Sequence, residues 1–91
     1  MEEKDKIDVL QIVLEAHSLS LLRALNVKTC RFKDLQPLIN NDKTLSIKLK
    51  RLKKYRLLEI VPISDDDRYF TGYKITERGK KLLKAIEDIK T

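Results

Sequence analysis

Residues 41–60 read NDKTLSIKLKRLKKYRLLEI, and this stretch carries most of the information in the chain. Leu45, Leu49 and Leu52 are separated by four and three residues, a spacing that predicts one buried face of a helix. Seven basic residues and no acidic residue lie between positions 43 and 58. An ordinary lysine-rich surface helix has carboxylates interspersed at i,i+4 positions. Their absence favours a polyanionic partner, for which the phosphate backbone of nucleic acid is the best candidate, over a merely solvated face.

The length of the chain bounds its architecture. Its 91 residues suffice for one small domain, so we expect a single domain over 1–91. The hydrophobic fraction of 42% is enough for a globular core and argues against a disordered basic tail. A core of this size is marginal for a lone subunit, which makes self-association plausible. The net charge of +6 is uneven, because positions 1–15 carry five carboxylates against two lysines.

The single cysteine, Cys30, excludes an intrachain disulfide and is consistent with a reducing compartment. No apolar stretch reaches membrane-spanning length, and the acidic N-terminus is unlike a signal peptide. We therefore expect a cytoplasmic protein without membrane attachment. The 37% of charged residues, rich in lysine, and only two glycines are typical of an archaeal or thermophilic source.

The first half of the chain predicts two helices around a short strand. Residues 5–25 have a broad apolar stripe at helical spacing, which suits a helix that packs on its own core and on a partner subunit, or one long helix in a monomer. Weak helix formers at 17–20 could break it. Residues 27–32 predict a small strand. A short helix then begins near Lys33 or Asp34, so that Pro37 falls in or near its first turn.

The second half predicts the basic helix, a hairpin and a last helix. Residues 40–42 form a turn whose last residue, Asp42, is a good N-cap, and the basic helix ends near residue 55 or 56. Residues 59–63 predict an edge strand interrupted by Pro62, residues 64–67 a polar turn, and residues 69–75 the return strand. Thr76 caps the last helix. One face of that helix carries Leu82, Leu83, Ile86 and Ile89.

Four motifs within residues 18–86 carry a resemblance to a known family. They are RFKDL at 31–35, KTLS at 43–46 followed by Leu49 and Leu52, RLLE at 56–59, and YKITERGKKLL at 73–83. Together they resemble the winged helix-turn-helix domain of HxlR-type regulators, and the last motif also resembles MarR-like and PadR-like proteins. The resemblance implies an α+β, mainly α fold with a β-hairpin wing and N- and C-terminal dimerisation helices.

The resemblance also implies a homodimer that binds double-stranded DNA with the helix at about 42–56 in the major groove and with the wing on the backbone or minor groove. Three features depart from the family pattern. Asn41-Asp42 replaces a Ser-Pro pair, Ile47 replaces a polar or basic reader, and residues 65–67 make the wing tip acidic. The acidic wing tip, the third of these, argues against insertion of the wing into DNA.

The helical spacing assigns candidate roles to ten residues. Lys43, Ile47, Lys50 and Lys54 lie opposite the leucines. The N-terminal part of a recognition helix enters the groove most deeply, so the candidates for base edges are Lys43, Thr44, Ser46, Ile47, Lys50 and Arg51. The candidates for phosphate contacts are Lys33, Lys53 and Lys54, and Arg68 is the candidate at the wing. Ile47 alternatively belongs to the core or to a protein interface.

Three further hypotheses stay open. Tyr69, Phe70 and Tyr73 either complete the core or stack on bases. Cys30 either packs as a small hydrophobe or senses oxidants, as in some HxlR-like proteins. No nucleophile arrangement, phosphate loop, metal-ligand spacing or cofactor motif is visible, so we expect neither an enzyme nor a bound metal or cofactor.

The sequence therefore predicts a dimeric, sequence-specific transcriptional regulator that binds double-stranded DNA. The acidic wing and Ile47 favour an alternative, a winged-helix module for protein–protein assembly in a transcription or RNA-processing complex. The operator, the regulated genes and the effector cannot be read from the sequence.

Overall fold

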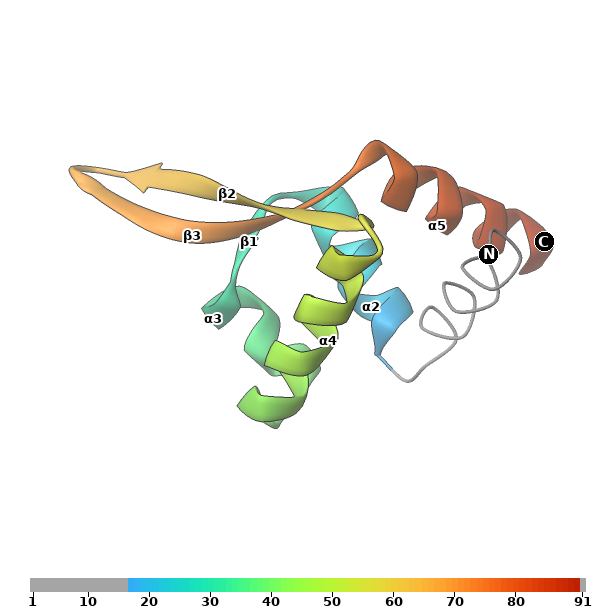
Figure 1. Cartoon of the computed structure of the whole chain (residues 1–91), viewed down its shortest axis with the longest axis horizontal. Helices are drawn as coiled ribbons and strands as arrows, with labels where there is room; N and C mark the ends of the chain where they lie inside the picture. The colour runs from blue at the N-terminus through green and yellow to red at the C-terminus, as the bar shows by residue number, and fades with distance from the viewer. Residues whose placement is uncertain (1–16, 91) are drawn as a thin grey trace.

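The computed structural model describes residues 17–90. A helical body carries a long two-stranded hairpin that extends away from it (Figure 1). The elements are, in chain order, α2 (Ser18–Val27), β1 (Cys30–Arg31), α3 (Phe32–Leu35), the 3₁₀ turn η1 (Gln36–Leu38), α4 (Asp42–Lys54), β2 (Leu58–Asp65), β3 (Arg68–Ile75) and α5 (Glu77–Lys90). The expected helical stretch at 5–16 lies outside the described residues.

Helix α2 begins at Ser18. Its N-cap residue, His17, has φ 72°, in the left-handed region, and belongs to the stretch of weak helix formers at 17–20. The helix buries Leu21, Leu22 and Leu25 and continues to Val27, which had been expected in a strand. The strand itself is only Cys30–Arg31.

The second helix differs from the prediction in how it accommodates Pro37. Helix α3 begins at Phe32 and ends at Leu35, so Pro37 lies after it, within the separate 3₁₀ turn η1. A proline inside the helix would clash with the carbonyl four residues earlier, whereas in the first turn of a new helix its missing N–H costs nothing. The backbone N–H of Arg31 donates to Asp34 Oδ2 at 3.0 Å, which closes the first turn of α3.

Helix α4 begins at Asp42, one residue earlier than predicted. Its N-cap is Asn41, whose extended backbone (φ −132°, ψ 113°) lets Oδ1 accept from the backbone N–H of Thr44 at 3.0 Å. Asp42, expected as the cap, is the first helical residue and its carboxylate accepts instead from Gln36 Nε2 at 3.0 Å. The helix ends at Lys54, and Arg56 (φ 61°) terminates it in the left-handed region.

The three strands form an antiparallel sheet of order β1-β3-β2. The β2–β3 hairpin, which we call the wing, pairs Leu58 with Ile75 at its base and Asp65 with Arg68 at its tip. Its strands are longer than predicted, and the turn is only Asp66 and Asp67, with Asp66 at φ 55°. Pro62 is tolerated because β2 is an edge strand, as expected.

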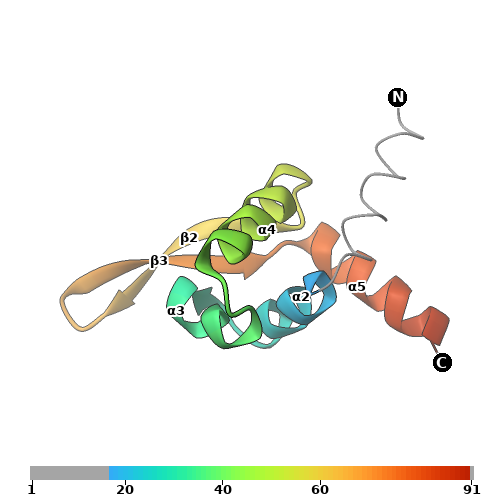
Figure 2. The same cartoon turned by 90° about the horizontal axis from the view of Figure 1, so that it is seen from below.

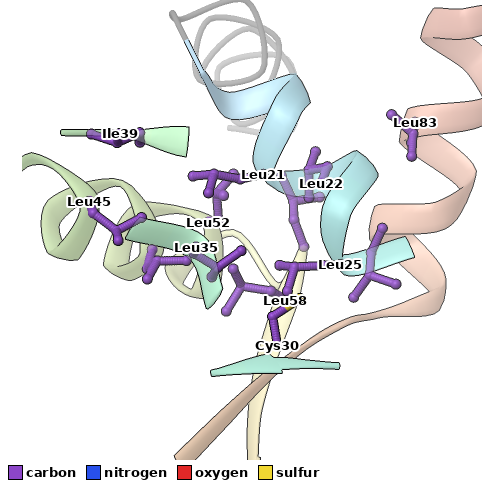
Figure 3. Packing of buried hydrophobic residues seen from close by; sticks show 13 residues of the cluster. Leu21, Leu22, Leu25, Cys30, Leu35, Ile39, Leu45, Leu52, Leu58 and Leu83 are labelled. Atoms are coloured by element: carbon purple, nitrogen blue, oxygen red, sulfur yellow. The ribbon is translucent and has the colours of Figure 1, made fainter. Parts of the chain in front are cut away.

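One hydrophobic cluster lies beneath α2, α4 and the base of the wing (Figure 3). The leucine faces of α2 and α4 meet there, with Leu35 between them. All three leucines predicted on α4 are buried, with Leu45 and Leu52 fully inaccessible. Tyr73 packs against this cluster, so one hairpin aromatic does complete the core. The architecture is α+β and mainly helical, as predicted.

Helix α5 begins at Glu77 and is capped by Thr76, as expected, since Thr76 Oγ1 accepts from the N–H of Gly79 at 3.0 Å. Its apolar face is covered only in part. Leu83 is 2% exposed and packs in the core, whereas Ile89 is 83% exposed. Leu82 and Ile86 pack against the core cluster and Ile89 does not, so the core covers only the first part of this face.

Candidate nucleic-acid interface

Helix α4 has one buried and one cationic face. Its leucines lie at 2% exposure or less, while Lys43, Lys50, Lys53 and Lys54 are all exposed on the remaining sides. Asp42 is its only carboxylate and lies in the first turn, where a negative charge suits the helix dipole. From residue 43 onward every charged side chain of α4 is therefore positive, which concentrates charge as contacts with a polyanion require.

A helix-turn-helix unit holds this face in place. Helix α3 and η1 precede α4, and the hydrogen bond between Gln36 and Asp42 ties the end of the turn to the start of α4. Leu35 and Ile39, at the junction of these elements, are buried, with exposed fractions of 0% and 5%. Short polar links between packed helices fix the angle of the second helix relative to the first. The N-terminal half of α4 thus rests on a defined support.

The structure gathers most of the predicted site residues on α4. Eight of the ten lie on this helix, with Thr44 and Ser46 half-buried at its flanks and the others exposed. Ile47 is 48% exposed, which rules out the alternative that it belongs to the core of the described chain. Lys33 is exposed on α3, the first helix of the unit. We therefore find nine of the ten candidates within one helix-turn-helix unit.

Arg68 is the exception. It lies at the tip of the wing, at the far end of the hairpin from α4 (Figures 1 and 2). It shares a shallow hollow with Asp65, Asp66, Asp67 and Phe70, so its charge is set against three carboxylates. The wing tip is therefore a mixed surface rather than a cationic one. Tyr69 beside it is 78% exposed and is not part of the core.

An arginine–aromatic contact joins the wing to the helix-turn-helix unit. The Arg31 guanidinium lies 4.5 Å from the centroid of the Phe70 ring, within the range of a cation–π interaction. Arg31 also pairs with Gly72 in the sheet, where a Cβ on residue 72 would collide with the Ile63 side chain. Sequence inspection did not single out this contact, because positions 31 and 70 are far apart in the chain.

Cys30 is buried in β1, at 4% exposure. Its Sγ lies 3.4 Å from the Lys28 carbonyl oxygen and 3.9 Å from that of Ala24, as a weak donor. Burial, and secondarily the Asp34 carboxylate, raise the pKa of the thiol above its ordinary value. A protonated, buried thiol is a poor nucleophile, so the geometry favours the packing role of Cys30 over oxidant sensing.

Two arginines escaped the prediction. Arg56 and Arg78 line a hollow at the C-terminal end of α4, together with Lys54 and Tyr55. Both stood within the motifs that carry the family resemblance, at 56–59 and 73–83, but their proximity depends on the hairpin folding back between them. Sequence spacing alone gives no signal for it.

The family assignment follows from a comparison of the sequence with models of known families. Residues 12–91 match the model described as HxlR-like helix-turn-helix. The chain belongs to this family. No curated protein matches the sequence at a significant level. The resemblance read from the four motifs is thus confirmed for nearly the whole chain.

Solved structures share the fold of this HxlR-like chain. One, described as a transcriptional regulator of the MarR family from Enterococcus faecalis V583, has a TM-score of 0.79 at 19% identity over 97% of this chain and 80% of that chain. Diamide-treated YodB from B. subtilis has a TM-score of 0.78 at 19% identity over 90% and 82%. HlyU from Vibrio cholerae N16961 has a TM-score of 0.71 at 13% identity over 97% and 94%. The winged-helix fold is therefore confirmed.

Residues 17–90 contain neither a cluster of metal ligands nor a membrane-spanning helix. No three His, Cys, Asp or Glu side chains of this part gather as ligands of one metal ion. Over the same residues, no helix combines the length and the apolar composition needed to cross a membrane. The family is a helix-turn-helix family, and the basic helix-turn-helix unit is the best-supported functional surface of the described residues.

Proposed function

We propose that this HxlR-like protein is a sequence-specific, double-stranded DNA-binding transcriptional regulator that acts as a homodimer. The observation that carries the proposal is the cationic face of α4, held out by the helix-turn-helix unit with its leucine face buried beneath it. Membership of a helix-turn-helix family supports the same conclusion. Helix α4 would lie in the major groove, since a helix fits its width.

The proposal assigns two kinds of contact on α4. Lys43, Thr44 and Ile47 lie in its N-terminal half and Lys50 lies three residues beyond Ile47. These four would face base edges, where Ile47 would pack against a thymine methyl group. Lys53, Lys54 and Lys33 would hold phosphates, which position the protein without reading the sequence. Arg68 would be the only contact from the wing tip, because its neighbouring carboxylates repel phosphate.

A gel shift with random duplex DNA, repeated over a range of salt concentrations, tests this function. Phosphate contacts release condensed counterions, so the logarithm of the affinity should fall linearly with the logarithm of salt concentration, by about 0.9 per contact. We expect measurable binding at low salt and a steep loss as salt rises. Absence of duplex binding at low salt would exclude the proposal.

The second candidate function is protein–protein assembly. Two observations favour it, the 48% exposure of Ile47 in the middle of α4 and the three aspartates at the wing tip. An exposed isoleucine amid lysines suits a protein surface as well as a thymine methyl. In that case the gel shift would be weak at every salt concentration, and Ile47→Ala would leave DNA affinity unchanged.

Dimerisation would use the terminal helices. Helix α5 continues beyond the core cluster, and Ile89 near its end is 83% exposed. Exposed apolar side chains on an extended helix favour association with a second copy. The two copies of α4 would then lie about 34 Å apart and read a palindromic site.

Sedimentation of Ile89→Glu tests the C-terminal contact, with Lys84→Glu as a control that also places a glutamate on the same helix. Because Ile89 is exposed, the substitution leaves the subunit core intact. We expect Ile89→Glu to lower the sedimentation coefficient toward that of a monomer and Lys84→Glu to leave it unchanged. A dimer retained by Ile89→Glu would remove this residue from the interface.

A further inference from the structure

A small cationic hollow lies where α4 ends and α5 begins. It has a volume of about 330 Å³ and is lined by Lys54, Tyr55, Arg56 and Arg78, with no carboxylate among the lining residues. Lys54 belongs to the exposed face of α4, so the hollow continues the candidate interface toward the base of the wing. This volume is at the small end of ligand sites and suits one compact anionic group.

Within the part of the chain that the structure describes, no side chain neutralises the two arginines of this hollow. Among residues 17–90, the side chains of Arg56 and Arg78 form no ion pair and no hydrogen bond. Nearby carboxylates, Glu59 and Glu77, line the larger adjoining hollow of about 670 Å³. One of them is already engaged, since Glu77 Oε1 lies 3.5 Å from Lys80 Nζ. The two arginines line this larger hollow as well, whereas neither carboxylate lines the smaller one, so the charged side chains that line the smaller hollow are all cationic.

The position of Arg78 has no explanation in the stability of the fold. It is the second residue of α5 and therefore lies at the positive end of the helix dipole, where a cation is unfavourable. Arg56 has φ 61°, a left-handed conformation that glycine or asparagine adopts more readily at a helix C-terminus. A bound anion would account for both arginines, because it would face two guanidinium groups and the N-terminus of α5 together.

The backbone holds the two arginines in one frame. The carbonyl oxygen of Arg56 accepts from Thr76 Oγ1 at 2.6 Å, and the carbonyl oxygen of Leu57 accepts from Thr76 N at 3.1 Å. Gly79 lies directly against the Leu57 carbonyl, where a Cβ could not be accommodated. These contacts fix the end of α4 against the start of α5 before any ligand arrives, so binding would order little besides the side chains.

We propose that this hollow binds a phosphate group. The planar guanidinium fork pairs with phosphate oxygens through two parallel hydrogen bonds, and Lys54 adds a third cation. The phosphate belongs either to the DNA backbone beside α4 or to a small phosphorylated molecule. Both sources present the same tetrahedral oxyanion, and the experiment below separates them.

Titration of the full chain with inorganic phosphate, followed by NMR, tests the hollow without DNA. We expect saturable shifts of the backbone amides of Tyr55, Arg56 and Arg78. Arg78→Gln and Arg56→Gln should each weaken phosphate affinity about tenfold, as loss of a charge-assisted hydrogen bond does. Lys84→Gln, on the exposed side of α5, is the matched control and should have no effect. Shifts spread evenly over all lysine-rich surfaces, or unaffected by Arg78→Gln, would overturn the proposal.

Thermal unfolding distinguishes ligand binding from a structural role. Removing a cation from the positive end of α5 should leave the Tm of Arg78→Gln in chloride equal to or above that of the wild type. Replacing chloride by phosphate at matched ionic strength should raise the Tm of the wild type and leave that of Arg78→Gln unchanged, because a ligand stabilises only a state that binds it. An equal rise in both proteins would contradict the proposed site.

Duplex binding against salt identifies the source of the phosphate, and this arm alone rests on the proposed function. If the group belongs to DNA, Arg78→Gln should reduce the slope of log affinity against log salt by about 0.9, one phosphate contact. If Arg78→Gln weakens phosphate binding but leaves this slope unchanged, the site takes a small phosphorylated ligand rather than the DNA backbone. A chain that binds phosphate in the hollow but no DNA would sink the proposed function and leave this site standing. If Arg78→Gln weakens neither phosphate binding nor DNA binding, the phosphate site is refuted.

Discussion

Helices α4 and α5 are built alike and differ in how their outer faces are charged. They have 13 and 14 residues, and each buries leucines against the same core cluster. Helix α5 carries acidic residues at both ends, and ion pairs join Glu77 to Lys80 and Glu87 to Arg23. On α4 all charges after Asp42 are positive. Burial therefore explains why both segments are helices, while the concentration of positive charge on α4 suits a polyanionic partner outside the chain.

If the buried faces are equivalent, they should respond alike to truncation. Leu52 on α4 is 0% exposed and Leu83 on α5 is 2% exposed. We expect Leu52→Ala and Leu83→Ala each to lower the free energy of unfolding by about 2–5 kcal/mol, from lost burial and the cavity left behind. Urea denaturation measures it, with Lys81→Ala as the exposed control. A cost below about 1 kcal/mol at Leu83 would show that α5 is not part of the core.

The caps of the two helices should differ in strength. Asn41 Oδ1 accepts one hydrogen bond, from the N–H of Thr44. Thr76 Oγ1 accepts from the N–H of Gly79 and also donates to the Arg56 carbonyl oxygen, so it ties α5 to the end of α4. We expect Asn41→Ala to cost about 1 kcal/mol of unfolding free energy and Thr76→Val about 2 kcal/mol. Equal costs in urea denaturation would mean that the second bond of Thr76 contributes nothing.

The compensated charges of α5 should contribute least. Arg23 Nε lies 3.2 Å from Glu87 Oε1, and both side chains are about half exposed, at 48% and 47%. Because water screens such a pair, we expect a double-mutant cycle of Arg23→Ala and Glu87→Ala to give a coupling of about 0.2–1 kcal/mol that shrinks with added salt. A coupling insensitive to salt would show that the contact is not electrostatic.

The sequence predicted the elements that repeat a local pattern. The leucine spacing of α4, the edge position of the strand containing Pro62, and the Thr76 cap are all confirmed, because each depends on residues within one turn or one strand. The prediction of the α4 cap was wrong where two adjacent polar residues could each serve as the N-cap. Asn41 rather than Asp42 caps α4 because the Asp42 carboxylate bonds to the side chain of Gln36, which lies six residues away.

In the candidate site, too, the sequence predicted what depends on local spacing and missed what depends on the tertiary fold. Eight of its ten predicted residues lie together on α4 because helical periodicity is local, and Lys33 lies on α3 of the same helix-turn-helix unit. The hollow of Arg56 and Arg78 and the Arg31–Phe70 contact were not foreseen, since they form only when the hairpin folds back on the helices. Periodicity placed Ile89 on the apolar face of the last helix, but it does not say where the core ends, and Ile89 is exposed.

The most direct measurement of the central claim compares duplex DNA binding by Lys50→Ala and Lys84→Ala. Each substitution removes one exposed lysine, the first from the cationic face of α4 and the second from α5. At about 50–200 mM salt we expect Lys50→Ala to lower affinity about tenfold and Lys84→Ala to leave it nearly unchanged. Equal losses in the two variants would mean that DNA responds only to net charge, and would contradict the assignment of α4 as the DNA-binding helix.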